Sequence, residues 1–186
     1  FIENHKFPEI KNIFWRNSNL NFNNKLNLIK SLDERPNKDW LRRIGECEDE
    51  KVLKYFLKDS TNLAVEDNPE VLNILWECCQ IPDFVKKTYG QHVQVVTKVF
   101  NFLISEKNKI PNQYMKKQLS LLDKLDGNVD SLSNRIANVR TWAYVSNKAN
   151  WVENQDYWIE RTKNIEDKLS DRLHEELTKS FIDKRA

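Results

Sequence analysis

Glycine is scarce in this chain, and that scarcity limits the folds open to it more than any other feature. The 186 residues include three glycines, at positions 45, 90 and 127, and five prolines. All-β folds and glycine-rich ligand loops need more turn-forming residues than this. Since 39% of the residues are hydrophobic, the chain can bury a core. The composition therefore predicts an all-α protein.

Apolar residues recur at helical spacing along most of the chain, which predicts a helical bundle with an irregular N-terminal segment. Residues 1–24 are expected to be irregular because they are rich in Asn and include Pro8. Pro82 suggests a subdivision near residue 82. The predicted helices cover residues 25–32, 38–46, 48–59, a stretch from Pro69, about 84–106, a stretch from Pro111, about 129–148, and about 154 to the end.

Charge is distributed unevenly, although the net charge is only +2. Residues 84–148 hold eleven basic and four acidic groups, whereas residues 46–83 hold three basic and ten acidic groups. We call residues 84–148 the basic segment. It is suited to binding phosphate groups. The alternatives are that it pairs with the acidic segment or simply forms a solvated surface.

Motifs that would carry catalysis are missing from the sequence. The three glycines are too far apart for a nucleotide-binding P-loop. The sequence "HEELT", residues 174–178, lacks the second histidine of a zinc-protease helix, and no carboxylate pair stands apart for acid–base chemistry. The three cysteines, two of them adjacent, make a poor disulfide framework and are expected to be reduced, as in the cytosol or the mitochondrial matrix. No apolar run is long enough to span a membrane.

The stretch "RIANVRTWAYVSNKANW", residues 135–151, is the strongest candidate for a binding surface. On a helical projection, Arg135 and Trp142 lie on one flank of an apolar stripe, and Arg140 and Tyr144 lie on the other. One interpretation is that the aromatic rings wall the core and the arginines stack on them. The other is a nucleic-acid surface, in which basic groups contact phosphates and rings stack on bases. The pair Lys116 and Lys117 gives a weaker signal of the same kind.

Four blocks of the sequence resemble a known family: "FPEIKNIFWRNSNLNF", "LWECCQIPDF", "LSNRIANVRTWAYVSNKANW" and "EDKLSDRLHEELTKSFIDKR". They resemble the C-terminal part of bacterial superfamily-two helicases, which are similar to the mitochondrial degradosome ATP-dependent RNA helicase. The resemblance implies that two RecA-like motor domains precede Phe1 and bind ATP and Mg²⁺. In that case this chain is a fragment, without catalytic residues, cofactor or metal of its own.

The same resemblance implies the organisation and partners of the chain. Residues 1–24 would follow the motor domains, and residues 25–186 would form an accessory domain that packs on them and binds single-stranded RNA or DNA. The expected location is the bacterial cytoplasm, or the mitochondrial matrix in a eukaryote. The mitochondrial relatives engage an exoribonuclease, so the competing interpretation is a protein-interaction module that does not touch nucleic acid. The expected nucleic-acid contacts are Arg135, Arg140, Trp142, Tyr144, Lys116 and Lys117.

Overall fold

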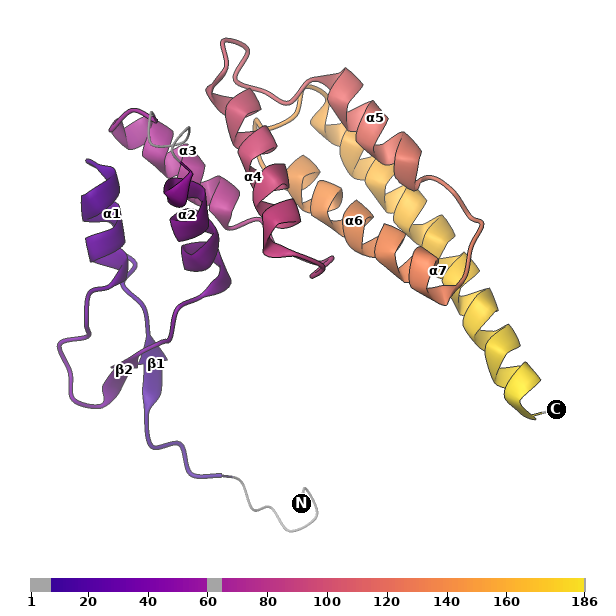
Figure 1. The fold of residues 1–186 in the computed structure, drawn as a ribbon, viewed down its shortest axis with the longest axis horizontal. Helices are drawn as coiled ribbons and strands as arrows, with labels where there is room; N and C mark the ends of the chain where they lie inside the picture. The colour runs from indigo at the N-terminus through magenta and orange to yellow at the C-terminus, as the bar shows by residue number, and fades with distance from the viewer. Residues whose placement is uncertain (1–7, 60–64, 186) are drawn as a thin grey trace. The chain divides into compact units, whose positions relative to one another are not determined.

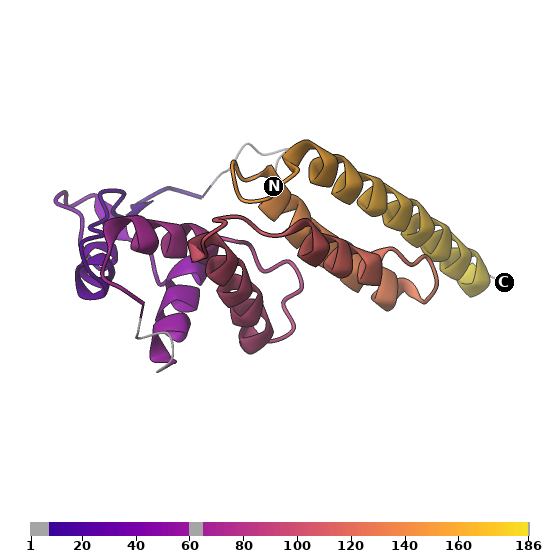
Figure 2. The same ribbon diagram turned by 90° about the horizontal axis from the view of Figure 1, so that it is seen from above.

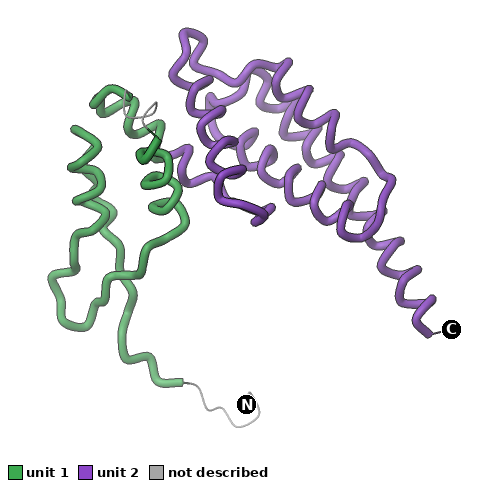
Figure 3. Tube along the Cα trace, in the orientation of Figure 1, with its two compact units in different colours: residues 1–76 green, residues 77–186 purple. Residues whose placement is uncertain are grey.

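The computed structural model describes residues 8–59 and 65–185, which form two compact units. Unit 1 comprises residues 1–76 and unit 2 comprises residues 77–186 (Figure 3). Across the described residues the chain has seven helices and one small two-stranded sheet (Figure 1). The predicted helical class is therefore confirmed. The boundary between the units falls within helix α3 (Pro69–Cys79) rather than at Pro82.

Unit 1 contains a parallel strand pair that the periodicity did not indicate. Strand β1 (Ile13–Trp15) pairs with β2 (Leu41–Arg43), and the backbone N–H of Ile44 donates to the carbonyl of Trp15 at 2.9 Å. The prediction of a helix over residues 38–46 was therefore wrong, and the segment 1–24 includes a strand. The first seven residues of that segment lie outside the described part of the chain. The reason for the error is that β2 is held by distant residues, which helical spacing within one segment cannot reveal.

Local residues stabilise the N-termini of the first two helices of unit 1 in different ways. The side chain of Asn24 accepts a hydrogen bond from the backbone N–H of Asn27 and so caps α1 (Lys25–Leu32). Helix α2 (Glu48–Lys58) begins with three acidic residues. Their negative charge stabilises the helix because its N-terminus carries a partial positive charge. Helices α1, α2 and α3 bury the apolar residues of this unit, namely Leu28, Leu32, Val52, Leu53, Phe56, Leu72, Leu75 and Trp76.

Unit 2 is built on three helices that run side by side (Figures 1 and 2). Helix α5 (Asn112–Leu122) packs on α6 (Val129–Asn147) and α7 (Gln155–Arg185), and α6 and α7 form the largest contact. The side chain of Asn128 caps α6. The core of the three helices includes Met115, Leu119, Leu132, Ile136, Val139, Trp142, Val145, Trp158, Ile165 and Leu169.

Helix α4 (Tyr89–Ile104) also belongs to unit 2, and it begins later than its predicted start near residue 84. Lys86 has a backbone φ of 52°, which is incompatible with a continuous right-handed helix. Thr88 then caps α4 by accepting from the backbone N–H of Gln91. None of the helices in the described part of the chain has the length and apolar character needed to cross a membrane.

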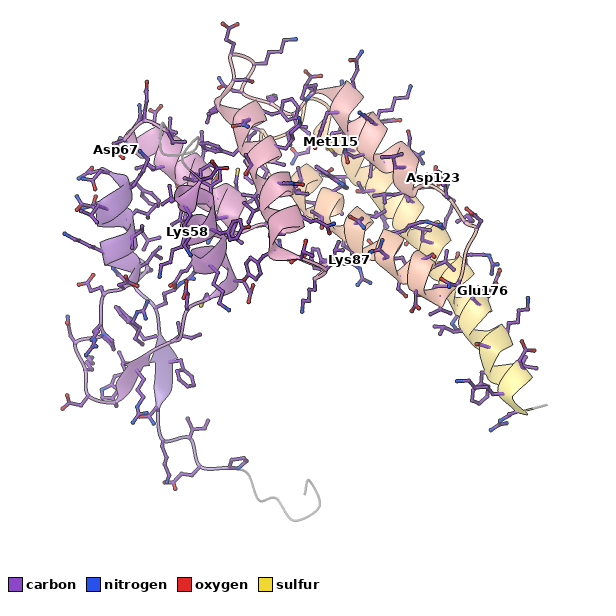
Figure 4. All side chains as sticks on the ribbon, in the orientation of Figure 1. Lys58, Asp67, Lys87, Met115, Asp123 and Glu176 are labelled. Atoms are coloured by element: carbon purple, nitrogen blue, oxygen red, sulfur yellow. The ribbon has the colours of Figure 1, made fainter. Side chains whose placement is uncertain are left out.

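Asp123, at the C-terminal end of α5, ties this helix to α7 (Figure 4). Its carboxylate accepts hydrogen bonds from Lys168 at 2.8 Å and from Arg161 at 2.7 Å. The hydrogen bond from Lys168 lowers the pKa of Asp123, and the bond from Arg161 acts in the same direction. The ionised form of Asp123 therefore stabilises the packing of α5 against α7.

We expect Asp123→Asn to lower the free energy of unfolding by roughly 1–2 kcal/mol at neutral pH, because two charge-assisted hydrogen bonds are weakened at a partly exposed site. Since the folded-state pKa lies below the usual Asp value of 3.8, the stabilisation is present above that value and is lost as pH falls through the folded pKa. Urea unfolding at pH 7 and below pH 3.8 measures the difference. Asp126→Asn, at a far more exposed carboxylate, is the control and should change stability little.

Candidate nucleic-acid interface

The guanidinium of Arg135 is engaged inside unit 2. Its Nη1 donates to the backbone carbonyl of Lys124 at 2.8 Å and to that of Asp126. Its side chain is only 17% exposed, and Nη2 lies 4.0 Å from the carboxylate of Asp126. Gly127, between α5 and α6, has a φ of 109°, a conformation that favours glycine. Arg135 therefore holds the α5–α6 loop closed, and a phosphate would have to compete with two carbonyl oxygens for it.

Trp142 is a core residue. It is 4% exposed, and its ring meets Tyr114 of α5 edge to face, with centroids 5.8 Å apart. Tyr114 in turn contacts Phe102 of α4 at 4.8 Å, and burial raises the pKa of the Tyr114 hydroxyl. These three rings connect α4, α5 and α6. The indole of Trp142 is therefore covered by other side chains and does not present a face for stacking on a base.

Arg140 and Tyr144, on the other flank of α6, remain accessible. Arg140 donates through Nε to Glu166 of α7 at 2.9 Å, yet its side chain is 53% exposed. Tyr144 is half-buried, and the ammonium of Lys148 lies 5.8 Å from the centre of its ring. Lys148 also lies 5.5 Å from the ring of Trp151. The structure thus brings a basic group close to a partly accessible aromatic ring. The basic group is Lys148 rather than Arg140, and Lys148 was not among the residues predicted to bind nucleic acid.

Lys116 and Lys117 are exposed on α5, whose buried face includes Met115 and Leu119 (Figure 4 labels Met115). They share a property with every lysine of the basic segment. None of the nine forms an ion pair with a carboxylate in the part of the chain that the structure describes, and seven are exposed. The positive charge of this segment therefore faces solvent largely without neutralisation. The nine are Lys86, Lys87, Lys98, Lys107, Lys109, Lys116, Lys117, Lys124 and Lys148.

A small cavity of about 110 Å³, with both polar and apolar lining, lies beside the N-terminal end of α4. Its polar lining residues include Gln91 and His92 of α4, Gln118 of α5 and Asn138 of α6. Asp83 and the exposed Lys87, which precede α4, also line it. Figure 4 labels Lys87. The sequence analysis missed this cavity because its lining residues come from separate helices. It adds hydrogen-bonding groups next to the exposed lysines of unit 2.

Cys47, Asp49 and Glu50 of unit 1 place one ligand atom each within 4.8 Å of one another, a spacing that could suit a metal ion. However, Arg16 donates to Asp49 at 2.7 Å and lies 3.7 Å from Glu50, and Arg43 lies 3.5 Å from Glu50. Two guanidinium groups already supply the positive charge that a cation would bring to these carboxylates. The cluster is therefore an ion-pair network that joins β1, β2 and α2.

Comparison with known proteins gives no relative for this chain. No protein-family model, no curated protein and no solved structure matches it.

Proposed function

We propose that the chain is a strand-binding accessory region of an ATP-dependent helicase that acts on RNA or DNA. The observation that supports the proposal is the set of nine lysines in the basic segment that lack ion-pair partners among the described residues. Basic groups of this kind bind a phosphate backbone without selecting a base sequence. Such binding suits an enzyme that must advance along any strand.

The six residues expected to contact nucleic acid divide into two groups under this proposal. Lys116 and Lys117 of α5 and Arg140 of α6 are exposed and contact phosphates, and Tyr144 offers a half-buried ring one helical turn after Arg140. The other two residues support the surface from inside. Trp142 anchors α6 in the core, and Arg135 holds the loop that leads into it.

The enzymatic part of the proposal depends on the sequence resemblance. ATP and Mg²⁺ would be bound by motor domains that precede Phe1, and this chain alone would not hydrolyse ATP. An exoribonuclease remains a candidate partner of the full protein. If the chain is instead a protein-interaction module, single strands should bind it weakly and without a steep dependence on salt.

Replacing Lys116 and Lys117 together with alanine should weaken binding of the chain to a fluorescent single-stranded oligonucleotide. If both lysines contact phosphates, the slope of log Kobs against log salt should become shallower by about 1.4, because each contact with a single strand contributes about 0.7. Fluorescence anisotropy titrations between low and moderate salt measure the slope. The fold should be preserved, since both residues are exposed and alanine favours helices.

The matched control is Lys30→Ala with Lys58→Ala, which removes the same charge from exposed positions in unit 1 (Figure 4 labels Lys58). A smaller change in slope for this control would support contacts on α5. An equal change in both variants would point to non-specific attraction. No measurable binding by the wild type would contradict the proposal and favour the protein-interaction module.

A further inference from the structure

One face of the strand pair in unit 1 carries an exposed aromatic ring beside an exposed basic group. Phe14 of β1 and Arg42 of β2 are partners in the register of the two strands. Neighbouring strands lie about 5 Å apart, and side chains alternate between the two faces of a sheet, so these two side chains are adjacent on one face. Both are exposed, and Phe14 is 68% exposed. In Figure 1 the strand pair lies beyond the ends of α1 and α2.

The opposite face of the strand pair meets the rest of unit 1. Among the residues that alternate with the exposed pair, Trp15, Leu41 and Arg43 are half-buried. The guanidinium of Arg43 lies 3.5 Å from the buried carboxylate of Glu50 in α2. The face that carries the exposed pair therefore points away from the core of unit 1.

Trp40 adds a second exposed ring at the start of β2. Its backbone carbonyl accepts from the N–H of Ile13, the residue directly before Phe14, at 3.4 Å. Trp40 is 53% exposed, and the ammonium of Lys38 lies 5.4 Å from the centre of its ring. Two accessible rings thus lie close to the same end of the strand pair, each with a basic group beside it.

The two basic groups are not neutralised by carboxylates. In the part of the chain that the structure describes, neither Arg42 nor Lys38 forms an ion pair. Asp33 pairs with Arg43 instead, and the exposed Asp39 follows Lys38 in the sequence without pairing with it. Accessible rings and unneutralised cations are the groups that bind the bases and phosphates of a single strand.

We propose that Phe14, Trp40, Arg42 and Lys38, which we call the stacking surface, bind the bases of a single-stranded nucleic acid. The rings stack on bases, and the basic groups contact the phosphates that link them. The strands have three residues each and are about 10 Å long, so this face is too small for a specific protein interface, which covers roughly 800 Å² on each partner. The class of ligand is that of the proposed function, on which this proposal rests, but the stacking surface adds contacts with bases to the phosphate contacts.

Two fluorescent strands of equal length separate stacking from phosphate contact. One is made of thymidine, and the other has an abasic site in place of every base. In anisotropy titrations the full wild-type chain should bind the thymidine strand more tightly, since only that strand can stack. Phe14→Ala with Trp40→Ala should weaken binding to the thymidine strand at least about fivefold and leave binding to the abasic strand unchanged. Arg42→Gln should instead weaken binding to both strands and make the salt slope shallower by about 0.7.

The matched control is Tyr55→Ala, which removes a 48% exposed ring from α2 and should leave both affinities unchanged. Phe14→Leu with Trp40→Leu keeps apolar bulk without rings and should lose the preference for the thymidine strand as the alanine variant does. Circular dichroism should show unchanged helix content in each variant.

A wild-type chain that binds both strands equally would overturn the stacking surface, as would a variant without the two rings that keeps the preference for bases. The proposed function would survive either result if Lys116→Ala with Lys117→Ala still made the salt slope shallower. A wild-type chain that binds neither strand would overturn both proposals.

Discussion

Replacing Trp142 with alanine should lower the free energy of unfolding of unit 2 by about 3–5 kcal/mol, the range found when a large aromatic ring is removed from a core. Trp142 is 4% exposed, and its contact with Tyr114 would be lost together with the buried area. Thermal or urea unfolding followed by circular dichroism measures the change.

Two further variants separate packing from nucleic-acid binding. Trp142→Phe keeps an aromatic ring in the core, so it should fold and bind single strands with nearly wild-type affinity. Tyr144→Leu changes the half-buried ring on the other flank of α6 and should cost less stability than Trp142→Ala. If Trp142→Phe instead weakened strand binding several-fold with little loss of stability, the indole would contact the bases, contrary to the packing described here.

Most helix positions could be predicted, because the residues that set them lie close together in the sequence. Asn24 and Asn128 cap the helices that follow them, and helix α1 begins and ends where the apolar spacing places it. Of the apolar stripe expected on α6, Leu132, Ile136 and Val139 are buried, and Ala143 is half-buried. In each case the residues that decide the structure lie within a few positions of one another.

The strand pair and the ion-pair network could not be predicted in the same way. Strand β2 pairs with a segment almost thirty residues earlier, and the carboxylate of Glu50 in α2 lies near Arg16, directly after β1, and near Arg43 of β2. The segment "ECEDE" reads as a solvated charge run, yet its last residue is fully buried. Periodicity measures how often apolar residues recur, so it cannot identify a charged residue that is buried because distant partners neutralise it.

The exposure of the predicted nucleic-acid contacts could not be predicted from local sequence either. A helical projection correctly put Arg135 and Trp142 on one flank of α6, but it could not tell that neighbouring elements cover that flank. The carbonyls that bind Arg135 belong to the loop before α6, and the ring that covers Trp142 belongs to α5. Lys116 and Lys117 are exposed on α5, and Arg140 stays 53% exposed although it donates to Glu166 of α7. Which side of a helix meets solvent is decided by the packing of the whole unit.

Replacing Glu50 with alanine should destabilise unit 1 by about 3–5 kcal/mol, the range expected when one partner of a buried ion pair is removed. The Glu50 side chain is 1% exposed and lies between the guanidiniums of Arg16 and Arg43. Burial raises the pKa of Glu50, while Arg43 and Arg16 act in the opposite direction. Without this carboxylate, Arg16 would keep its bond to Asp49 and Arg43 its bond to Asp33. Among the described residues, the Nε of Arg43 and both carboxylate oxygens of Glu50 are buried without a hydrogen-bond partner, so the attraction is between charges rather than through hydrogen bonds. Urea unfolding of the full chain at pH 7 measures the loss.

A double-mutant cycle with Arg43 tests whether this loss comes from unpaired charge or simply from a cavity. If it comes from charge, Glu50→Ala with Arg43→Ala should cost at least about 1 kcal/mol less than the sum of the two single changes, because neither charge is then left without its partner. Glu46→Ala, at a more exposed carboxylate that pairs with Lys54, should cost well under about 1 kcal/mol. Additive losses in the cycle would mean that Glu50 and Arg43 act separately. In that case β2 would be held against α2 by packing rather than by the buried ion pair.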